Sequence, residues 1–108
     1  MASFLIVDGD RNFREALAIA LKLDGHAVAA AGSAEEALAR IAAGRPDCCV
    51  VDAHLLGSDA VLETAAAAGA RTVVTGPHED LLVHAARRHP CAQPLPKPFG
   101  AEALARPA

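Results

Sequence analysis

The chain has 108 residues, a length that suits one domain with a single hydrophobic core. Hydrophobic residues make up 53% of it and aromatic residues only 3%, so the core is expected to pack small aliphatic side chains closely. A net charge of -3, without a run of Lys or Arg, excludes a domain that holds a nucleic-acid backbone by charge alone.

The first half of the chain alternates short apolar runs with segments of helical period. Asp8 cuts the first apolar run short, so this run is neither a signal peptide nor a membrane span, and we expect a cytoplasmic protein. Gly25 ends the first helix, and Ser33 with Glu36 forms a capping box for the second. The predicted elements are a strand over Phe4–Val7, a helix over Arg11–Leu23, a strand over Ala27–Ala31, a helix from Ser33 through Ala42 and a strand over Cys48–Val51.

The second half continues this alternation. Ser58 or Asp59 is predicted to cap the third helix, which Gly69 ends. Pro94 and Pro96 restrict the last strand to an edge of a sheet, because proline cannot donate to a strand ladder. The predicted elements are a helix from about Asp59 to Ala68, a strand over Thr72–Thr75, a helix over Pro77–Arg88, a strand over Ala92–Leu95 and a short helical stub from Gly100 onward.

Five strands that alternate with helices predict an α/β fold with one parallel sheet and helices on both faces. The length and the strand count favour a flavodoxin-like, doubly wound sheet of order 2-1-3-4-5 with a truncated last helix. That order places a ligand crevice between strands 1 and 3, at their carboxyl ends.

The three cysteines form no CxxC pair and indicate no disulfide framework. Cys48 and Cys49 are neighbours in a predicted strand, so their side chains are expected to point to opposite faces. We interpret both as small buried apolar residues of a protein from a reducing compartment.

Four polar residues end the predicted strands: Asp8, Asp52, Thr75 and Lys97. The carboxyl ends of parallel strands meet at one edge of a sheet, so these side chains are expected to lie close together. One carboxylate can act as a nucleophile and another can help to hold Mg²⁺. A hydroxyl and an ammonium can stabilise charge on a transferring phosphoryl group. Each residue alone has an ordinary explanation, such as helix capping, but together they favour phosphoryl transfer.

Four stretches follow one another in a recognisable order: Phe4–Asp8, Val50–Asp52, Val73–Gly76 and Lys97–Phe99. Through them the chain resembles the receiver domains of two-component response regulators over nearly its whole length. The resemblance implies a role in phosphorelay signal transduction, in which a histidine kinase or phosphotransfer protein donates a phosphoryl group. A downstream effector domain or protein would then bind the changed surface. The domain would be a phosphoprotein carrying an aspartyl phosphate, and not a turnover enzyme.

The resemblance also implies roles for single residues. Asp52 would be the phosphoacceptor, and Thr75 would hydrogen-bond a phosphoryl oxygen and shift on activation. Lys97 would pair with Asp52 or with its phosphate, and its peptide bond to Pro98 would be cis.

The same resemblance implies a Mg²⁺ site with one departure from the family pattern. Asp8, Asp52 and the backbone carbonyl of His54 would hold the cation. The family usually has a second acid directly after the first strand, and here Gly9 takes that position. We therefore expect weak Mg²⁺ binding, with Asp10 as the candidate to replace the missing carboxylate.

A second departure concerns output. The family has an aromatic switch residue three positions before the lysine, and this chain has Pro94 there. The face between the fourth and fifth helices, through which many receivers pair, is incomplete, so homodimer formation is left open. We expect no nucleic-acid or membrane contact by this domain, which spans residues 1–108 alone or as the N-terminal part of a longer protein.

Two other functions fit parts of the sequence. A receiver-like module that binds its partner without phosphorylation would account for the missing acid and the missing aromatic. The run that ends in Asp8-Gly9-Asp10 also resembles the first motif of haloacid dehalogenase-type phosphatases, with Asp8 as nucleophile. No acidic pair follows a later strand, however, and Asp52 would then have no role.

Overall fold

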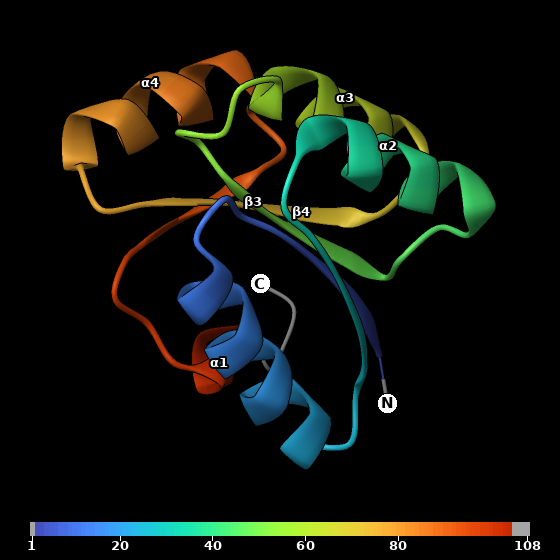
Figure 1. Cartoon of the computed structure of the whole chain (residues 1–108). Helices are drawn as coiled ribbons and strands as arrows, with labels where there is room; N and C mark the ends of the chain where they lie inside the picture. The colour runs from blue at the N-terminus through green and yellow to red at the C-terminus, as the bar shows by residue number, and fades with distance from the viewer. Residues whose placement is uncertain (1, 105–108) are drawn as a thin grey trace.

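The computed structural model describes residues 2–104 and contains one parallel five-stranded sheet of order β2-β1-β3-β4-β5 (Figure 1). This confirms the predicted flavodoxin-like order. The strands are β1 (Ser3–Val7), β2 (Ala27–Ala31), β3 (Cys48–Asp52), β4 (Arg71–Gly76) and β5 (Gln93–Pro96). The helices are α1 (Arg11–Leu23), α2 (Ala34–Ala43), α3 (Ser58–Ala67), α4 (Glu79–Arg88) and the short 3₁₀ helix η1 (Ala101–Leu104).

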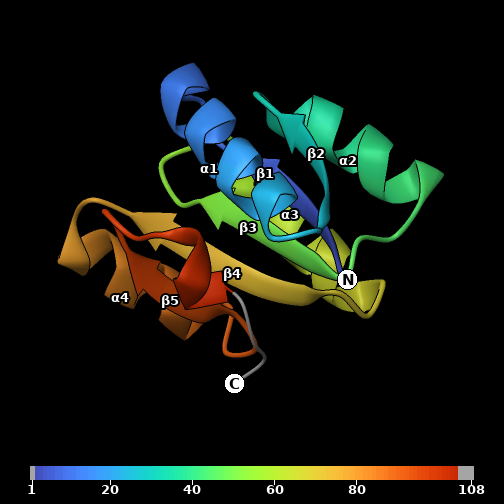
Figure 2. The same cartoon turned by 90° about the horizontal axis from the view of Figure 1, so that it is seen from below.

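The helices cover both faces of the sheet. Helices α2, α3 and α4 lie on one face, and α1 and η1 lie on the other (Figures 1 and 2). Side chains alternate along a strand, so Leu5 and Val7 pack toward α2–α4 while Phe4 and Ile6 pack toward α1. Burial of the inner strands on both faces explains why they are continuous apolar runs. Within residues 2–104, no helix is long and apolar enough to cross a membrane.

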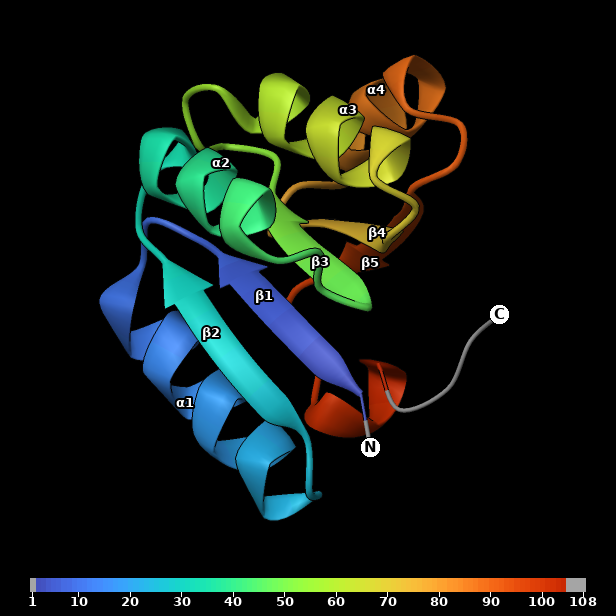
Figure 3. The same ribbon diagram turned by 90° about the vertical axis from the view of Figure 1, so that its right-hand side faces the viewer.

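The two edges of the sheet are β2 and β5. Figure 3 shows β2 as the outer strand beside α1 and α2. The edge position of β5 was predicted from Pro94 and Pro96, which pair with Val74 and Gly76 of β4. The truncated last helix is a single 3₁₀ segment at Ala101–Leu104, and the rest of that predicted stub lies outside the described residues.

The predicted cap of α3 is wrong. Gly57 is the N-cap, with a φ of 86° that favours glycine, and no side chain caps the helix. The hydroxyl of Ser58 donates instead to a backbone carbonyl of the preceding loop, at 3.3 Å. Asp59 binds Arg88 and His89 at the end of α4, with its carboxylate 2.6 Å from Nε2 of His89. The Asp59 carboxylate, which the sequence pattern assigned to capping α3, therefore makes a tertiary contact with α4 instead.

Two other helix starts refine the prediction. The Ser33 hydroxyl accepts from the backbone N–H of Glu36 at 3.2 Å, which confirms the predicted cap of α2. Glu36 accepts from the backbone N–H of Gly32, one residue before the position that a capping box uses. Helix α4 begins at Glu79, two residues later than predicted.

Two of the three cysteines, Cys48 and Cys49, are buried, which disfavours their thiolate form. Desolvation raises the pKa of Cys48 to about 11 and that of Cys49 to about 12, whereas Cys91 is exposed. We therefore expect iodoacetamide at about pH 8 to modify only Cys91 in the folded protein, because the thiolate is the nucleophile. Intact mass should show one adduct, none for Cys91→Ser, and three for the wild type in denaturant. Equal modification of all three thiols before unfolding would contradict the buried positions.

Candidate functional site

The register of the sheet brings the predicted strand-end residues to one edge. Val7 of β1 pairs with Val51 of β3, so Asp8 lies level with Asp52. Asp52 in turn pairs with Thr75 of β4. The two carboxylates and the hydroxyl therefore come from three adjacent strands at one height.

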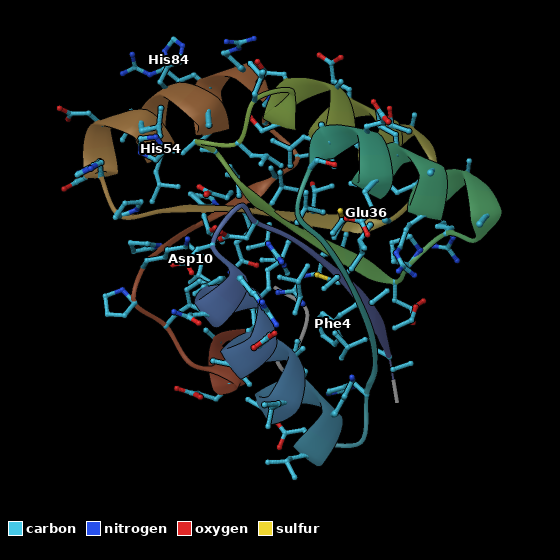
Figure 4. The ribbon with its side chains drawn as sticks, viewed as in Figure 1. Phe4, Asp10, Glu36, His54 and His84 are labelled. Atoms are coloured by element: carbon cyan, nitrogen blue, oxygen red, sulfur yellow. The ribbon has the colours of Figure 1, made fainter. Side chains whose placement is uncertain are left out.

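A cleft of about 380 Å³ opens at this edge. Asp10 and His54 lie at this same end of the sheet, Asp10 at the start of α1 and His54 in the loop after β3 (Figure 4). Two larger hollows, beside α2 and beside α4, do not include the strand-end carboxylates. The residues that line the cleft are Asp8, Gly9, Asp10, Asp52, His54, Leu55, Leu56, Pro77 and Lys97.

Lys97 reaches the cleft from the segment after β5 and pairs with Asp8. Its Nζ lies 2.7 Å from Oδ2 of Asp8, whose side chain is only 1% exposed. The predicted partner of Lys97 was Asp52 or its phosphate. The one ion pair of Lys97 within residues 2–104 is with Asp8, so the pair with Asp52 is not formed, and a pair with the phosphate stays a prediction. The peptide bond between Lys97 and Pro98 is cis, as predicted.

Asp52 is half-buried and keeps one carboxylate oxygen unengaged. Its Oδ1 accepts from the backbone N–H of His54 at 3.0 Å. Its Oδ2 has no hydrogen-bond partner among the described residues. Asp52 does not cap α3, so an ordinary helix-capping role is excluded for it.

Thr75 lies fully buried next to Asp52, and its hydroxyl oxygen has no hydrogen-bond partner in the described part of the chain. A buried polar group without a partner costs about 1–3 kcal/mol. Thr75 lies in register with Asp52 on the neighbouring strand, so the unpartnered hydroxyl belongs to the same end of the sheet.

The donors available to a cation are few. Both oxygens of Asp8 are engaged, Oδ2 by Lys97 and Oδ1 by the backbone N–H of Asp10 at 2.8 Å. Asp10 uses its Oδ1 to cap α1 by accepting from Asn12 and Phe13. No three His, Cys, Asp or Glu side chains between residues 2 and 104 are grouped to hold a metal.

The oxygens of cleft residues that have no hydrogen-bond partner in the described part of the chain include Oδ2 of Asp52, Oδ2 of Asp10 and the carbonyl of His54. Mg²⁺ in proteins keeps several waters and often takes one or two carboxylates plus substrate phosphates. Oxygens of this kind, completed by water, fit a divalent cation. The roles of Asp8 and Asp10 as metal ligands stay predictions.

Two aromatic residues near the site were not predicted to belong to it. The Nζ of Lys97 lies 4.2 Å from the ring centroid of Phe13, and the Phe99 ring meets Phe13 edge-on with centroids 5.6 Å apart. The spacing along α1 marked Phe13 only as a core residue. The sequence places Phe99 two residues after Lys97, but Phe13 lies 84 residues before it and nothing in the sequence links it to the lysine.

Comparison with known proteins places this geometry in a family. A family model described as the response regulator receiver domain matches residues 4–106. The transcriptional regulatory protein AfsQ1 of Streptomyces coelicolor is 41% identical over 59 residues, which cover 55% of this chain and 26% of AfsQ1.

Solved structures agree with the fold. NtrX of Brucella abortus superposes with a TM-score of 0.82 and 28% identity, over 96% of this chain and 25% of NtrX. A response regulator protein of Burkholderia pseudomallei, solved with a phosphorylated aspartic acid, calcium ion and citrate, gives a TM-score of 0.83 and 24% identity. It covers 97% of this chain and 65% of that one. The chain thus spans about a quarter of the length of AfsQ1 and of NtrX.

Proposed function

The chain belongs to the family of response regulator receiver domains, and we propose that it accepts a phosphoryl group on Asp52 in two-component signalling. The observation that carries the proposal is that Asp52, which keeps one carboxylate oxygen free, lies in register with Thr75, whose buried hydroxyl has no hydrogen-bond partner among residues 2–104. We propose a cytoplasmic histidine kinase or phosphotransfer protein as donor. A downstream effector domain or protein would respond to the changed surface, and the domain would act as an acceptor without turnover.

The chemistry assigns one task to each side chain. Oδ2 of Asp52 attacks the phosphorus of a phosphohistidine, the P–O bond forms, the P–N bond breaks, and the leaving imidazole takes a proton from solvent. The Thr75 hydroxyl donates to a phosphoryl oxygen, and the Lys97 ammonium neutralises charge there. Mg²⁺ would be held by the His54 carbonyl and by the Asp52 oxygen that does not attack, and it would supply further positive charge to the phosphoryl oxygens.

A small phosphodonor tests this function without the kinase. The purified chain is incubated with acetyl phosphate, with Mg²⁺ or with a chelator in place of the metal, and its intact mass is measured. We expect one added phosphoryl group with Mg²⁺ and almost none with the chelator. If no group is added under either condition, the domain is instead a receiver-like module that binds without phosphorylation.

Gly9 offers a gain-of-function test of the metal site. A Cβ at Gly9 would meet only the Leu55 side chain, at an ordinary contact distance of 3.7 Å. Gly9→Asp is therefore expected to fold and to supply the missing carboxylate. We expect Mg²⁺ to bind about tenfold more tightly, because cation affinity rises with the number of charged ligands.

Calorimetric titration with Mg²⁺ measures this change. Gly44→Asp is the matched control, because it adds the same charge at a position where a Cβ meets nothing within 4 Å. Equal Mg²⁺ affinity in the two variants would show that Gly9 does not border the cation.

A further inference from the structure

The ammonium group of Lys97 contacts two side chains, the Asp8 carboxylate and the Phe13 ring, and we call this binding position the seat. The Nζ is 2.7 Å from Oδ2 of Asp8 and 4.2 Å from the Phe13 ring centroid. The Lys97 side chain is 17% exposed, so the seat is largely shielded from water. Attraction between a cation and an aromatic face strengthens with such desolvation.

Contacts of both its backbone and its ring fix the position of Phe13. The backbone N–H of Phe13 donates to the Asp10 carboxylate that caps α1, at 3.3 Å. Its ring packs against Phe99, two residues after Lys97. Both rings pack against the apolar cluster that contains Ala101 and Leu104 of η1. The seat therefore links Lys97 to the first turn of α1 and to η1.

We propose that Phe13 is a positioning residue that holds the Lys97 ammonium on Asp8 in the unphosphorylated domain, and that phosphorylation of Asp52 draws the ammonium off Phe13. The second half rests on the proposed function. A phosphoryl group brings about -1.5 to -2 charge to the cleft, which competes with the single charge of Asp8 for the ammonium.

The release gives the domain a route for output that does not need an aromatic residue at position 94. Pro94 is exposed on β5, and its ring cannot exchange buried and exposed rotamers. When the ammonium leaves, the Phe13 ring loses its cation and the Phe13–Phe99 pair adjusts. The adjustment then reaches η1, which shares the apolar cluster with both rings.

The small number of lysines makes the environment of Lys97 in the unphosphorylated domain easy to observe. The chain has two lysines, and Lys22 is exposed near the end of α1. Selective lysine labelling therefore gives two ε-methylene signals in an NMR spectrum. The ring current of Phe13 should move the Lys97 signal upfield of the Lys22 signal.

Two substitutions separate the aromatic ring from its bulk. Phe13→Leu keeps an apolar side chain and removes the ring, so the upfield shift of Lys97 should be lost. Phe13→Tyr keeps the ring and should retain the shift, at a melting temperature close to that of the wild type. A Lys97 signal that is unchanged in Phe13→Leu, or lost in both variants, overturns the positioning role.

The phosphorylated state is tested with beryllium fluoride, a non-covalent phosphoryl mimic, in the presence of Mg²⁺. Binding should move the wild-type Lys97 signal toward that of Lys22, with amide shifts at η1. Phe13→Leu should bind the mimic about threefold more tightly, because no cation–π contact is lost on binding. Equal affinities of the wild type and Phe13→Leu for beryllium fluoride overturn the proposed release of Lys97 from Phe13. If neither protein binds the mimic, the proposed phosphoryl-acceptor function fails, while the positioning role in the unphosphorylated domain still rests on the Lys97 shift.

Discussion

Replacing Asp52 with Asn is expected to abolish phosphoryl incorporation from acetyl phosphate while the domain stays folded. The amide is not a nucleophile, so no acyl phosphate can form. The substitution preserves shape, and the amide oxygen can still accept from the backbone N–H of His54, now at 3.0 Å. Intact mass measures the loss, and thermal unfolding followed by circular dichroism should show little change in melting temperature.

The matched control is Asp80→Asn, which removes the same charge from an exposed position on α4. It should take up phosphate at the wild-type level. Continued incorporation by Asp52→Asn would move the acceptor to another carboxylate and would contradict the role of the β3 strand end.

Replacing Lys97 with Met is expected to lower the free energy of unfolding by about 3 kcal/mol, because it leaves the buried Asp8 carboxylate without its cation. Met keeps most of the apolar stem of the side chain, so little packing is lost. Urea denaturation measures the change. Under the proposed release, the variant should also fail to couple phosphorylation to output, because it lacks the ammonium that would move from Asp8 to the phosphoryl oxygens.

A double variant separates the buried charge from other effects. Adding Asp8→Asn to Lys97→Met removes the uncompensated charge and should recover much of the lost stability. Lys22→Met, at the other lysine, should cost less than about 0.5 kcal/mol because that side chain is exposed. If Lys97→Met costs no more than Lys22→Met, the Asp8 pair does not stabilise the domain.

The strands and the place of the site were predictable because both depend on local pattern, and the order of the sheet followed from the chain length and the strand count. Strands buried on both faces must be continuous apolar runs, so each run and the polar residue that ends it stand out in the sequence. Helix α1 was predicted to the residue, from Arg11 to Leu23, because its apolar stripe is regular and Gly25 follows it. Parallel pairing then brings Asp8, Asp52 and Thr75 together without further information.

The partners of individual side chains were not predictable in the same way. Asp59 binds His89 rather than capping α3, and Lys97 binds Asp8 rather than Asp52. These pairs are 30 and 89 residues apart in the chain. The choice between two nearby partners is decided by how the loops approach in three dimensions. The ring of Phe13 beside Lys97 belongs to the same class of long-range contact.

The measurement that tests the central claim most directly is the identification of the phosphorylated residue. Borohydride reduces an aspartyl phosphate to a stable alcohol and so marks the acceptor after treatment with acetyl phosphate and Mg²⁺. Trypsin then places Asp8 and Asp52 on different peptides, residues 1–11 and 41–71. We predict the mark at Asp52 in the second peptide. A mark at Asp8 in the first peptide would contradict the receiver mechanism and would favour a phosphatase-type nucleophile at the end of β1.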